Sequence, residues 1–145
     1  MIIYLDSSGL VKRYVAETDS EQFVGVWESQ EMLSISAVGY AEVMAACGRR
    51  RRDGDMPEGA YESLVATFKK DWRCMEVIAV STHLNDIIDR LTYHYVLRGF
   101  DSIHLASAME MRNISGEEVL FVSADNRLRA AAGEEGLSVF PKVQP

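Results

Sequence analysis

Two of the predicted strands end at a carboxylate. The chain begins M-I-I-Y-L-D-S-S, so an apolar run leads directly into Asp6. A later segment, V-L-F-V-S-A-D-N, places Asp125 just past the end of another apolar run. A charged residue at the end of a buried apolar segment usually has a binding partner or a function. Ligands of open parallel sheets bind beyond the carboxyl ends of the strands, so we expect Asp6 and Asp125 to lie close together if their strands are neighbours.

Two further acids fit the same place. Asp101 stands at the start of a predicted helix, and Glu42 lies in the second turn of a helix that is apolar around it. Four carboxylates brought together, with no obvious Lys or Arg set among them, would repel one another strongly. A hard divalent cation held by oxygen ligands, Mg²⁺ or Mn²⁺, resolves that repulsion. The set therefore predicts a metal site.

Each acid also has a structural alternative. Asp101 and Asp125 suit the N-terminal caps of helices, where a carboxylate accepts hydrogen bonds from free backbone N–H groups. Asp6 suits a turn at the end of a strand, and Glu42 could face water on its helix. Taken one at a time these explanations are sufficient, and only the set of four at equivalent ends of βα units favours the metal site.

Apolar runs alternate with helical patterns along the whole chain, which predicts an α/β fold with a mostly parallel sheet of four to five strands flanked by helices. We expect Ser7 or Ser8 to cap a first short helix, a second helix over 20–28, and a helix capped by Ser36. Pro57 is expected in the first turn of another helix, which ends near Trp72. The expected strands cover residues 2–5, 32–35, 75–80, 119–122 and 137–140.

Composition limits the class of protein. A chain of 145 residues with 48% hydrophobic and 26% charged residues is typical of one globular domain, here residues 1–145. The net charge of −7 gives no general attraction for nucleic acid, although a local basic patch remains possible. Cys47 and Cys74 are too few for a disulfide framework or a zinc module. We see no secretory signal and no membrane-spanning segment, and expect a soluble cytoplasmic protein.

Four segments of the chain together resemble the motif series of PIN-domain ribonucleases, above all the VapC toxins of type II toxin–antitoxin pairs. In chain order they are L-D-S-S-G-L-V-K-R-Y, S-A-V-G-Y-A-E-V, F-D-S-I-H-L-A-S-A and F-V-S-A-D-N-R-L. The resemblance covers nearly the whole chain and implies a three-layer PIN-like fold. It also implies that Asp6, Glu42, Asp101 and Asp125 form a metal-binding catalytic pocket.

The resemblance implies a function as well. The expected activity is that of a Mg²⁺- or Mn²⁺-dependent endoribonuclease, which cuts single-stranded or looped RNA and leaves a 5′-phosphate and a 3′-hydroxyl. Asp6, Asp101 and Asp125 would hold the metal ion, and Glu42 would complete the site or orient the attacking water. A cognate antitoxin protein and a homodimer are the expected partners.

Neighbouring residues have secondary roles in this interpretation. Ser7 and Ser123 could hydrogen-bond the carboxylates, although helix capping explains them equally well. RNA phosphates require basic residues, and Arg49, Arg50 and Arg127 are the candidates; the run 49–52 could instead be a solvated helix end or pair with an acidic partner. His104 lies one helical turn after Asp101, which is close enough for a contact with the site, although a structural histidine packed within the helix is the favoured interpretation.

Other functions fit the sequence less well. A haloacid-dehalogenase-type phosphotransferase would have a second Asp at position 8, which is Ser8, and a receiver domain would have a Lys after a late strand, which is missing. A PIN-like module that binds without cutting is disfavoured by the presence of all four acids. An RNA-processing PIN nuclease that has no antitoxin remains an alternative.

Overall fold

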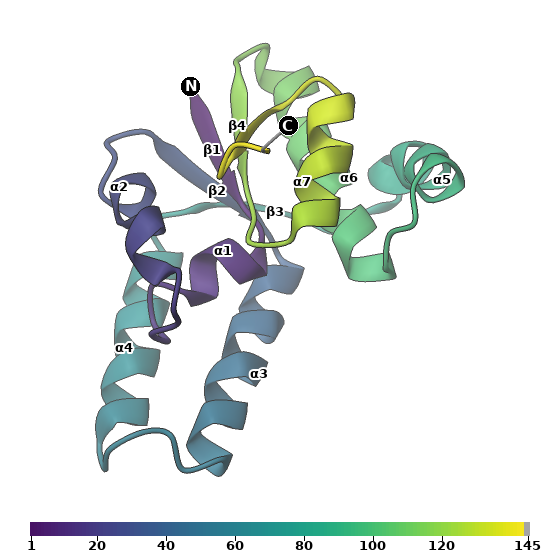
Figure 1. The fold of residues 1–145 in the computed structure, drawn as a ribbon. Coiled ribbons are helices and arrows are strands. Elements are labelled where there is room, and N and C mark those ends of the chain that lie inside the picture. Colours follow the sequence, from purple (N-terminus) through teal and green to yellow (C-terminus); the bar gives the residue numbers. More distant parts are fainter. Residues whose placement is uncertain (144–145) are drawn as a thin grey trace.

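The computed structural model describes residues 1–143 and consists of a five-stranded sheet with helices on both faces (Figure 1). All four strand pairings are parallel, and the strand order is β3-β2-β1-β4-β5. The strands are β1 (Ile2–Leu5), β2 (Met32–Ser36), β3 (Glu76–Ile78), β4 (Val119–Val122) and β5 (Ser138–Phe140). This architecture confirms the predicted three-layer α/β fold. The expected domain, residues 1–145, extends over positions 144 and 145, which lie outside the described residues.

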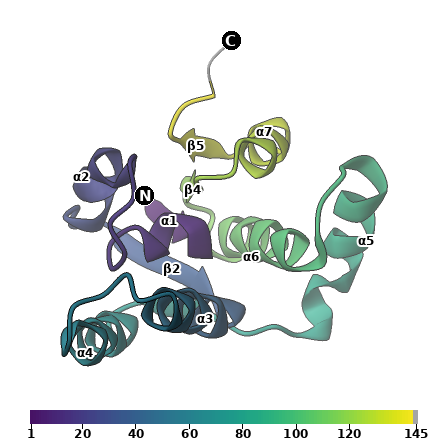
Figure 2. The same ribbon diagram turned by 60° about the horizontal axis from the view of Figure 1, so that its bottom comes forward.

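Helices connect successive strands and cover the two faces of the sheet. They are α1 (Ser7–Val11), α2 (Val24–Trp27), α3 (Val38–Arg52), α4 (Ala60–Trp72), α5 (Asn85–His94), α6 (Gly99–Ser115) and α7 (Asn126–Glu134), with 3₁₀ turns at Ser20–Phe23 and Thr82–Leu84. Figure 2 shows α1 to α4 on one side of the sheet and α5 to α7 on the other. Within residues 1–143, no helix is both long and apolar enough to cross a bilayer.

Successive side chains of β1 point to opposite faces of the sheet and pack into two separate hydrophobic cores. Ile2 and Tyr4 pack beneath α5, α6 and α7, in a cluster that also contains Phe121. Ile3 and Leu5 pack on the opposite face, beneath α1, α3 and α4. Because β1 is central and buried on both faces, it reads in the sequence as a continuous apolar run.

The sheet brings Asp6 and the end of β4 together at one edge. β1 pairs with β4, and the backbone N–H of Asp6 donates to the carbonyl of Val122 at 3.0 Å. Helix α1 begins immediately after Asp6 and crosses close to β4. A Cβ atom at Gly9 would lie only 3.1 Å from the carbonyl oxygen of Val122, so a residue without a side chain allows this close approach. The two strands are therefore neighbours, which was the condition for Asp6 and Asp125 to lie close together.

Several local expectations were wrong. Asp6, and not Ser7 or Ser8, is the N-cap of α1, because its side chain accepts the N–H of Gly9. Ser36 is the last residue of β2, and α3 follows Ala37. Pro57 lies in the turn before α4, whose N-cap is Gly59 with a positive φ of 80°. The expected helix over 20–28 is a 3₁₀ turn followed by one helical turn, and β3 is shorter than expected at both ends.

Candidate active site

The four acids come from four elements that meet at the carboxyl edge of the sheet. Asp6 follows β1, Glu42 lies on α3, Asp101 on the first turn of α6, and Asp125 at the start of α7. They fall into two pairs according to what holds them. We call Asp6 and Glu42 the inner pair, because uncharged or buried groups bind them, and Asp101 and Asp125 the outer pair, because both face one exposed arginine.

Asp6 is held by hydrogen bonds on both carboxylate oxygens. Its residue is only 4% exposed. Oδ1 accepts from the hydroxyl of Ser8 at 2.7 Å and from the N–H of Gly9 at 2.9 Å, and Oδ2 accepts from the hydroxyl of Ser123 at 2.8 Å. Burial raises the pKa of Asp6 above its usual range, although these hydrogen bonds oppose the shift. The local structure thus holds a carboxylate at a site that penalises its charge.

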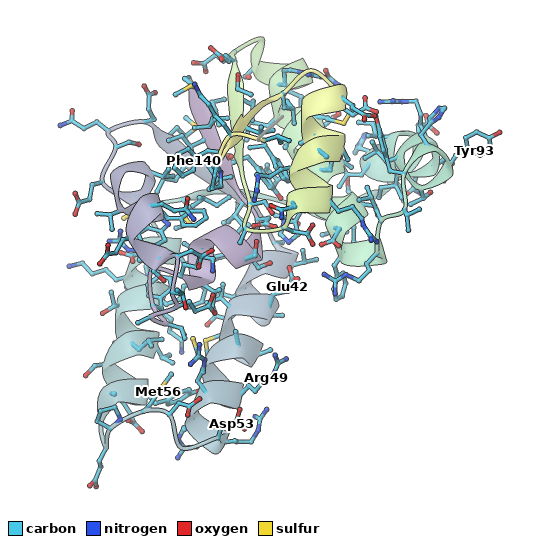
Figure 3. The ribbon with its side chains drawn as sticks, viewed as in Figure 1. Glu42, Arg49, Asp53, Met56, Tyr93 and Phe140 are labelled. Carbon is cyan, nitrogen blue, oxygen red and sulfur yellow. The ribbon has the colours of Figure 1, made fainter. Side chains whose placement is uncertain are left out.

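Glu42 is bound through a single oxygen. Its Oε1 accepts from the hydroxyl of Ser7 at 2.5 Å and lies 2.6 Å from Nε2 of His104. Burial raises the pKa of Glu42, but the hydrogen bonds from His104 and Ser7 outweigh it, and the net pKa lies below its usual value. Figure 3 shows Glu42 on the part of α3 nearest the sheet. A charged carboxylate is therefore stabilised at this position.

The outer pair faces the guanidinium of Arg98, whose side chain is 83% exposed. Nε of Arg98 donates to Oδ2 of Asp101 at 3.1 Å, and its NH2 group lies 4.0 Å from Oδ2 of Asp125. The second oxygen of Asp125 accepts the N–H of Leu128 at 3.0 Å and so caps α7. Asp125 thus has the capping role that the sequence left open, and one oxygen still faces the site.

Two cavities adjoin at Arg98 and Asp101. One, of about 370 Å³, is lined by Glu42, Arg98, Gly99, Phe100 and Asp101. The other, of about 600 Å³, extends past Asp125 and Arg127. A further cavity of about 600 Å³ lies beside Ala124 and Asn126 and contains none of the four acids. The two cavities that share Arg98 are therefore lined by three of the four acids, Glu42, Asp101 and Asp125.

The donor set fits a hard divalent cation. All four candidate ligands supply carboxylate oxygens, which Mg²⁺ and Mn²⁺ prefer. Arg98 already places one positive charge against Asp101 and Asp125. Among residues 1–143, however, no group of three or more His, Cys, Asp or Glu side chains is arranged around a single point as metal ligands. Binding therefore requires side-chain movement, and the exposed Arg98 is the group most free to move.

The predicted RNA-contacting arginines lie in different places. Arg127 is exposed and lines the cavity that contains Asp101 and Asp125. Arg49 lies seven residues beyond Glu42 on α3, about 10 Å along the helix, and Figure 3 shows it toward the far end. Arg50 lies 3.6 Å from a carboxylate oxygen of Asp55 and 3.7 Å from one of Glu17. Of the three, Arg127 is therefore nearest the acids.

Sequence reasoning missed two residues of the site and gave too little weight to a third. Arg98 gave a signal, since it precedes Asp101 by three residues and this spacing brings side chains together on a helix. The sequence allows a site contact for His104 but favours a structural role; in the structure His104 contacts Glu42 directly. Tyr4, whose hydroxyl oxygen lies 2.8 Å from Nδ1 of His104, is in the middle of a buried strand, where the sequence pattern predicts a core residue. Ser7 and Ser123 make the carboxylate hydrogen bonds described above.

Comparison with known proteins agrees with this geometry. The family model of the PIN domain matches residues 3–134. Ribonuclease VapC45 of Mycobacterium tuberculosis (strain CDC 1551 / Oshkosh) is 28% identical over 141 residues, which cover 97% of this chain and 95% of the relative.

Solved structures show the same fold at lower identity. FitAcB from Neisseria gonorrhoeae superposes with a TM-score of 0.68 at 14% identity, covering 95% of this chain and 96% of the other. VapBC2 from Rickettsia felis, bound to a DNA fragment from its promoter, gives a TM-score of 0.64 at 12% identity, with coverage of 96% and 97%. The fold, the four acids at its carboxyl edge and the match over residues 3–134 lead to one conclusion: this chain belongs to the PIN domain family.

Proposed function

We propose that this chain is a metal-dependent endoribonuclease that acts as the toxin of a type II toxin–antitoxin pair. One observation carries the proposal. In a chain of the PIN domain family, Glu42, Asp101 and Asp125 line two adjoining cavities, and the hydroxyl group of Ser123 links Asp6 to the backbone N–H of Asp125. Acids from separate elements meet where a parallel sheet binds its ligands.

The names of related proteins support the substrate and the biological role. The relative from Mycobacterium tuberculosis is named a ribonuclease and matches along almost its whole length. Structures of similar fold include a toxin–antitoxin complex from Klebsiella pneumoniae and VapBC2 from Rickettsia felis. We therefore favour RNA as the substrate, an antitoxin protein as the partner, a homodimer as the assembly and the cytoplasm as the compartment.

The residues divide the work of phosphodiester hydrolysis. Asp6, Asp101 and Asp125 would hold Mg²⁺ or Mn²⁺, and Glu42 would complete the site or orient the attacking water through its second oxygen. A bound divalent ion supplies positive charge to the phosphoryl oxygens and to the leaving oxygen. Ser7 and Ser123 hold the carboxylates in place. Arg127 offers positive charge to RNA phosphates beside the outer pair, with Arg49 and Arg50 as more distant contacts.

The first test is cleavage of a mixed RNA pool by purified wild type and Asp101→Asn, each with Mg²⁺, Mn²⁺ or EDTA. We expect the wild type to cut the pool only with a divalent ion and the variant to be inactive. Both proteins should show the same circular dichroism, because Asp101 is a partly exposed residue in the first turn of α6 and an amide has nearly the same size as a carboxylate. Metal-dependent cutting by Asp101→Asn at the wild-type rate would overturn the assignment.

A second test separates a toxin from an RNA-processing nuclease that has no antitoxin. Expression of the wild type in bacterial cells should arrest growth, and expression of Asp101→Asn should not. A toxin should have a small adjacent open reading frame whose co-expression restores growth and yields a complex of the two proteins, and the absence of such a reading frame would favour the RNA-processing alternative. Sustained growth with an active enzyme would favour the RNA-processing alternative, and an inactive wild type would favour the binding module.

A further inference from the structure

A buried chain of hydrogen bonds runs from the middle of the sheet to Glu42. The backbone N–H of Ser36 donates to the hydroxyl oxygen of Tyr4 at 3.1 Å. That hydroxyl lies 2.8 Å from Nδ1 of His104, and Nε2 of His104 lies 2.6 Å from Oε1 of Glu42. Tyr4 is 0% and His104 1% exposed. Neither residue can touch RNA, so any effect on the reaction must pass through Glu42.

We assign the bond directions in this chain from the donors and acceptors that the side chains offer. The Tyr4 oxygen accepts the N–H of Ser36, and the proton of this buried hydroxyl group needs an acceptor of its own. Within residues 1–143, Nδ1 of His104 is the acceptor bonded to it. We therefore assign Nδ1 as the acceptor and Nε2 as the nitrogen that carries the hydrogen. That hydrogen points at Oε1 of Glu42, which needs a donor.

We propose that Tyr4 and His104 form a positioning relay for Glu42, in which the Tyr4 hydroxyl selects the Nε2–H form of His104 and His104 in turn fixes the carboxylate. The proposal rests on the proposed function, because it assigns the relay to the ribonuclease site. Ser7 donates to the same oxygen of Glu42, and its hydroxyl oxygen lies 3.0 Å from Nε2 of His104, so the three groups form one cluster. Oε2 accepts no hydrogen bond from the described residues, so the relay leaves it available to a metal ion or to the attacking water.

A purely structural role explains these contacts less well. A buried His–Glu contact could stabilise the packing of α6 against α3, but an apolar residue could do so without burying two polar rings. Outer partners that orient metal ligands typically contribute about 10- to 100-fold to metal affinity or activity. The usual arrangement has a carboxylate orienting a ligand histidine, and here a histidine orients a ligand carboxylate.

The first experiment observes directly which ring nitrogen of His104 carries a proton, and it does not require the protein to cleave RNA. Long-range ¹H–¹⁵N spectra of the full-length, ¹⁵N-labelled protein in EDTA should show His104 with Nε2 protonated and Nδ1 unprotonated. The resonances are assigned by their loss in His104→Gln, and the exposed His83 and His94 serve as internal references. In Tyr4→Phe, the His104 ring should lose this fixed form. A wild-type His104 that carries its proton on Nδ1, or that averages both forms, would overturn the relay.

The second experiment separates positioning from packing. His104→Leu should lower kcat by about 10- to 100-fold with little change in KM for RNA, and Tyr4→Phe should lower kcat by a smaller factor. His104→Gln should recover much of the loss, because its amide can both donate to Glu42 and accept from Tyr4. A matched control is Tyr14→Phe. Tyr14 packs against the hydrophobic core on the opposite face of the sheet, and the variant removes the partly buried hydrogen bond that its hydroxyl group donates to Asp71. This control should lower stability without changing kcat.

Manganese binding decides the outcome if no substrate RNA is found. Calorimetric titration with Mn²⁺ should show weaker binding by folded His104→Leu and Tyr4→Phe than by wild type, and near-normal binding by His104→Gln and Tyr14→Phe. Equal Mn²⁺ affinity across all variants, together with equal kcat, would overturn the relay even if the wild type is an active nuclease. An inactive wild type with the expected spectra and Mn²⁺ series would instead overturn the proposed function and leave the relay standing.

Discussion

The two halves of the acid site are held in opposite ways. The inner pair, Asp6 and Glu42, is bound by hydroxyl groups, a backbone N–H and a buried histidine. The outer pair, Asp101 and Asp125, faces Arg98, whose side chain is 83% exposed. Buried hydrogen bonds fix a carboxylate in one geometry, whereas an exposed ion pair is weak and easily exchanged. The inner pair is therefore preorganised, and the outer pair is the part that can adapt to a metal ion or to RNA.

This difference also explains how four acids can coexist in a folded protein. Hydrogen-bond donors partly compensate the charges of Asp6 and Glu42. These donors are held in place, because they belong to α1, to α6 and to the end of a buried strand. Asp101 and Asp125 share one movable cation. A divalent ion that displaces Arg98 would exchange one positive charge for two at the same place, at little cost to the fold.

The largest expected effect on RNA cleavage comes from removing the charge of Asp6, one of the two acids of the inner pair. Asp6→Asn should reduce RNA cleavage by at least about 100-fold, because a ligand carboxylate is lost, not merely a group that orients one. The folded protein should be as stable as wild type or more so, since the change relieves a buried charge. Cleavage rates and urea denaturation of the same preparation check both parts.

The result for Asp6→Asn has a matched control in the outer pair. Asp125→Asn should also impair cleavage, but without the gain in stability, because the Asp125 side chain is 36% exposed and also caps α7. Equal stability changes in the two variants would contradict the distinction between the pairs.

A smaller effect is expected from removing the cation of the outer pair. Arg98→Ala should tighten Mn²⁺ binding roughly two- to fivefold, because an exposed ion pair that competes for Asp101 and Asp125 is lost. The effect should shrink as salt is added. Calorimetry at low and high ionic strength measures both. Weaker Mn²⁺ binding in Arg98→Ala, with Arg98→Lys like wild type, would show instead that Arg98 holds the outer pair in a metal-ready arrangement.

The amino-acid sequence predicted the inner and outer pairs unequally well. The order of strands and helices and the placement of Asp6, Asp101 and Asp125 follow from local patterns, since apolar runs and the residues that end them are short-range features. The partners of the inner pair are long-range contacts. Tyr4 and His104 are 100 residues apart, and neither residue has a periodicity that distinguishes it from the core.

Local helix boundaries were harder to predict for a related reason. Ser7, Ser8 and Asp6 are all good N-cap residues, so propensity alone cannot choose among them. The choice is made by Gly9, whose contact with the end of β4 places its N–H against Asp6. Pro57 suits the first turn of a helix, yet the positive φ of Gly59 delays α4 until Ala60. In both cases a glycine position decided the boundary.

A further contrast concerns RNA binding near the outer pair. Arg127 lines the same cavity as Asp101 and Asp125, whereas Arg49 lies about 10 Å along α3 from Glu42. In an inactive Asp101→Asn background, Arg127→Ala should weaken RNA binding and reduce the slope of log affinity against log salt by about 0.7, the loss of one single-strand phosphate contact. Arg49→Ala should change the slope less. Fluorescence anisotropy with labelled RNA measures both, and a larger change for Arg49→Ala would move the RNA path onto α3.

The smallest expected effect is a difference in the pH dependence of stability within the inner pair. Burial raises the folded-state pKa of Asp6 above its usual 3.8. As pH rises from 3.8 through the folded-state value, the unfolded chain loses this proton first, so the contribution of Asp6 to stability falls. For Glu42, hydrogen bonds outweigh burial and lower the folded-state pKa below 4.5. Its contribution is present above pH 4.5 and is lost as pH falls through the folded-state value.

Removing each acid should therefore change stability with opposite signs. Relative to wild type, Asp6→Asn should gain free energy of unfolding as pH rises from about 3 to 7, and Glu42→Gln should lose it over the same range. Urea denaturation in EDTA at several pH values measures both differences, and Glu62→Gln on the exposed side of α4 gives the baseline for removing an acid. If the two variants changed the pH dependence of the free energy of unfolding with the same sign, the distinction would fail: Asp6 would not be a carboxylate destabilised by burial beside a Glu42 carboxylate stabilised by hydrogen bonds. The two acids would then share a single environment, and the separate support of Glu42 by Ser7 and His104 would have no energetic consequence.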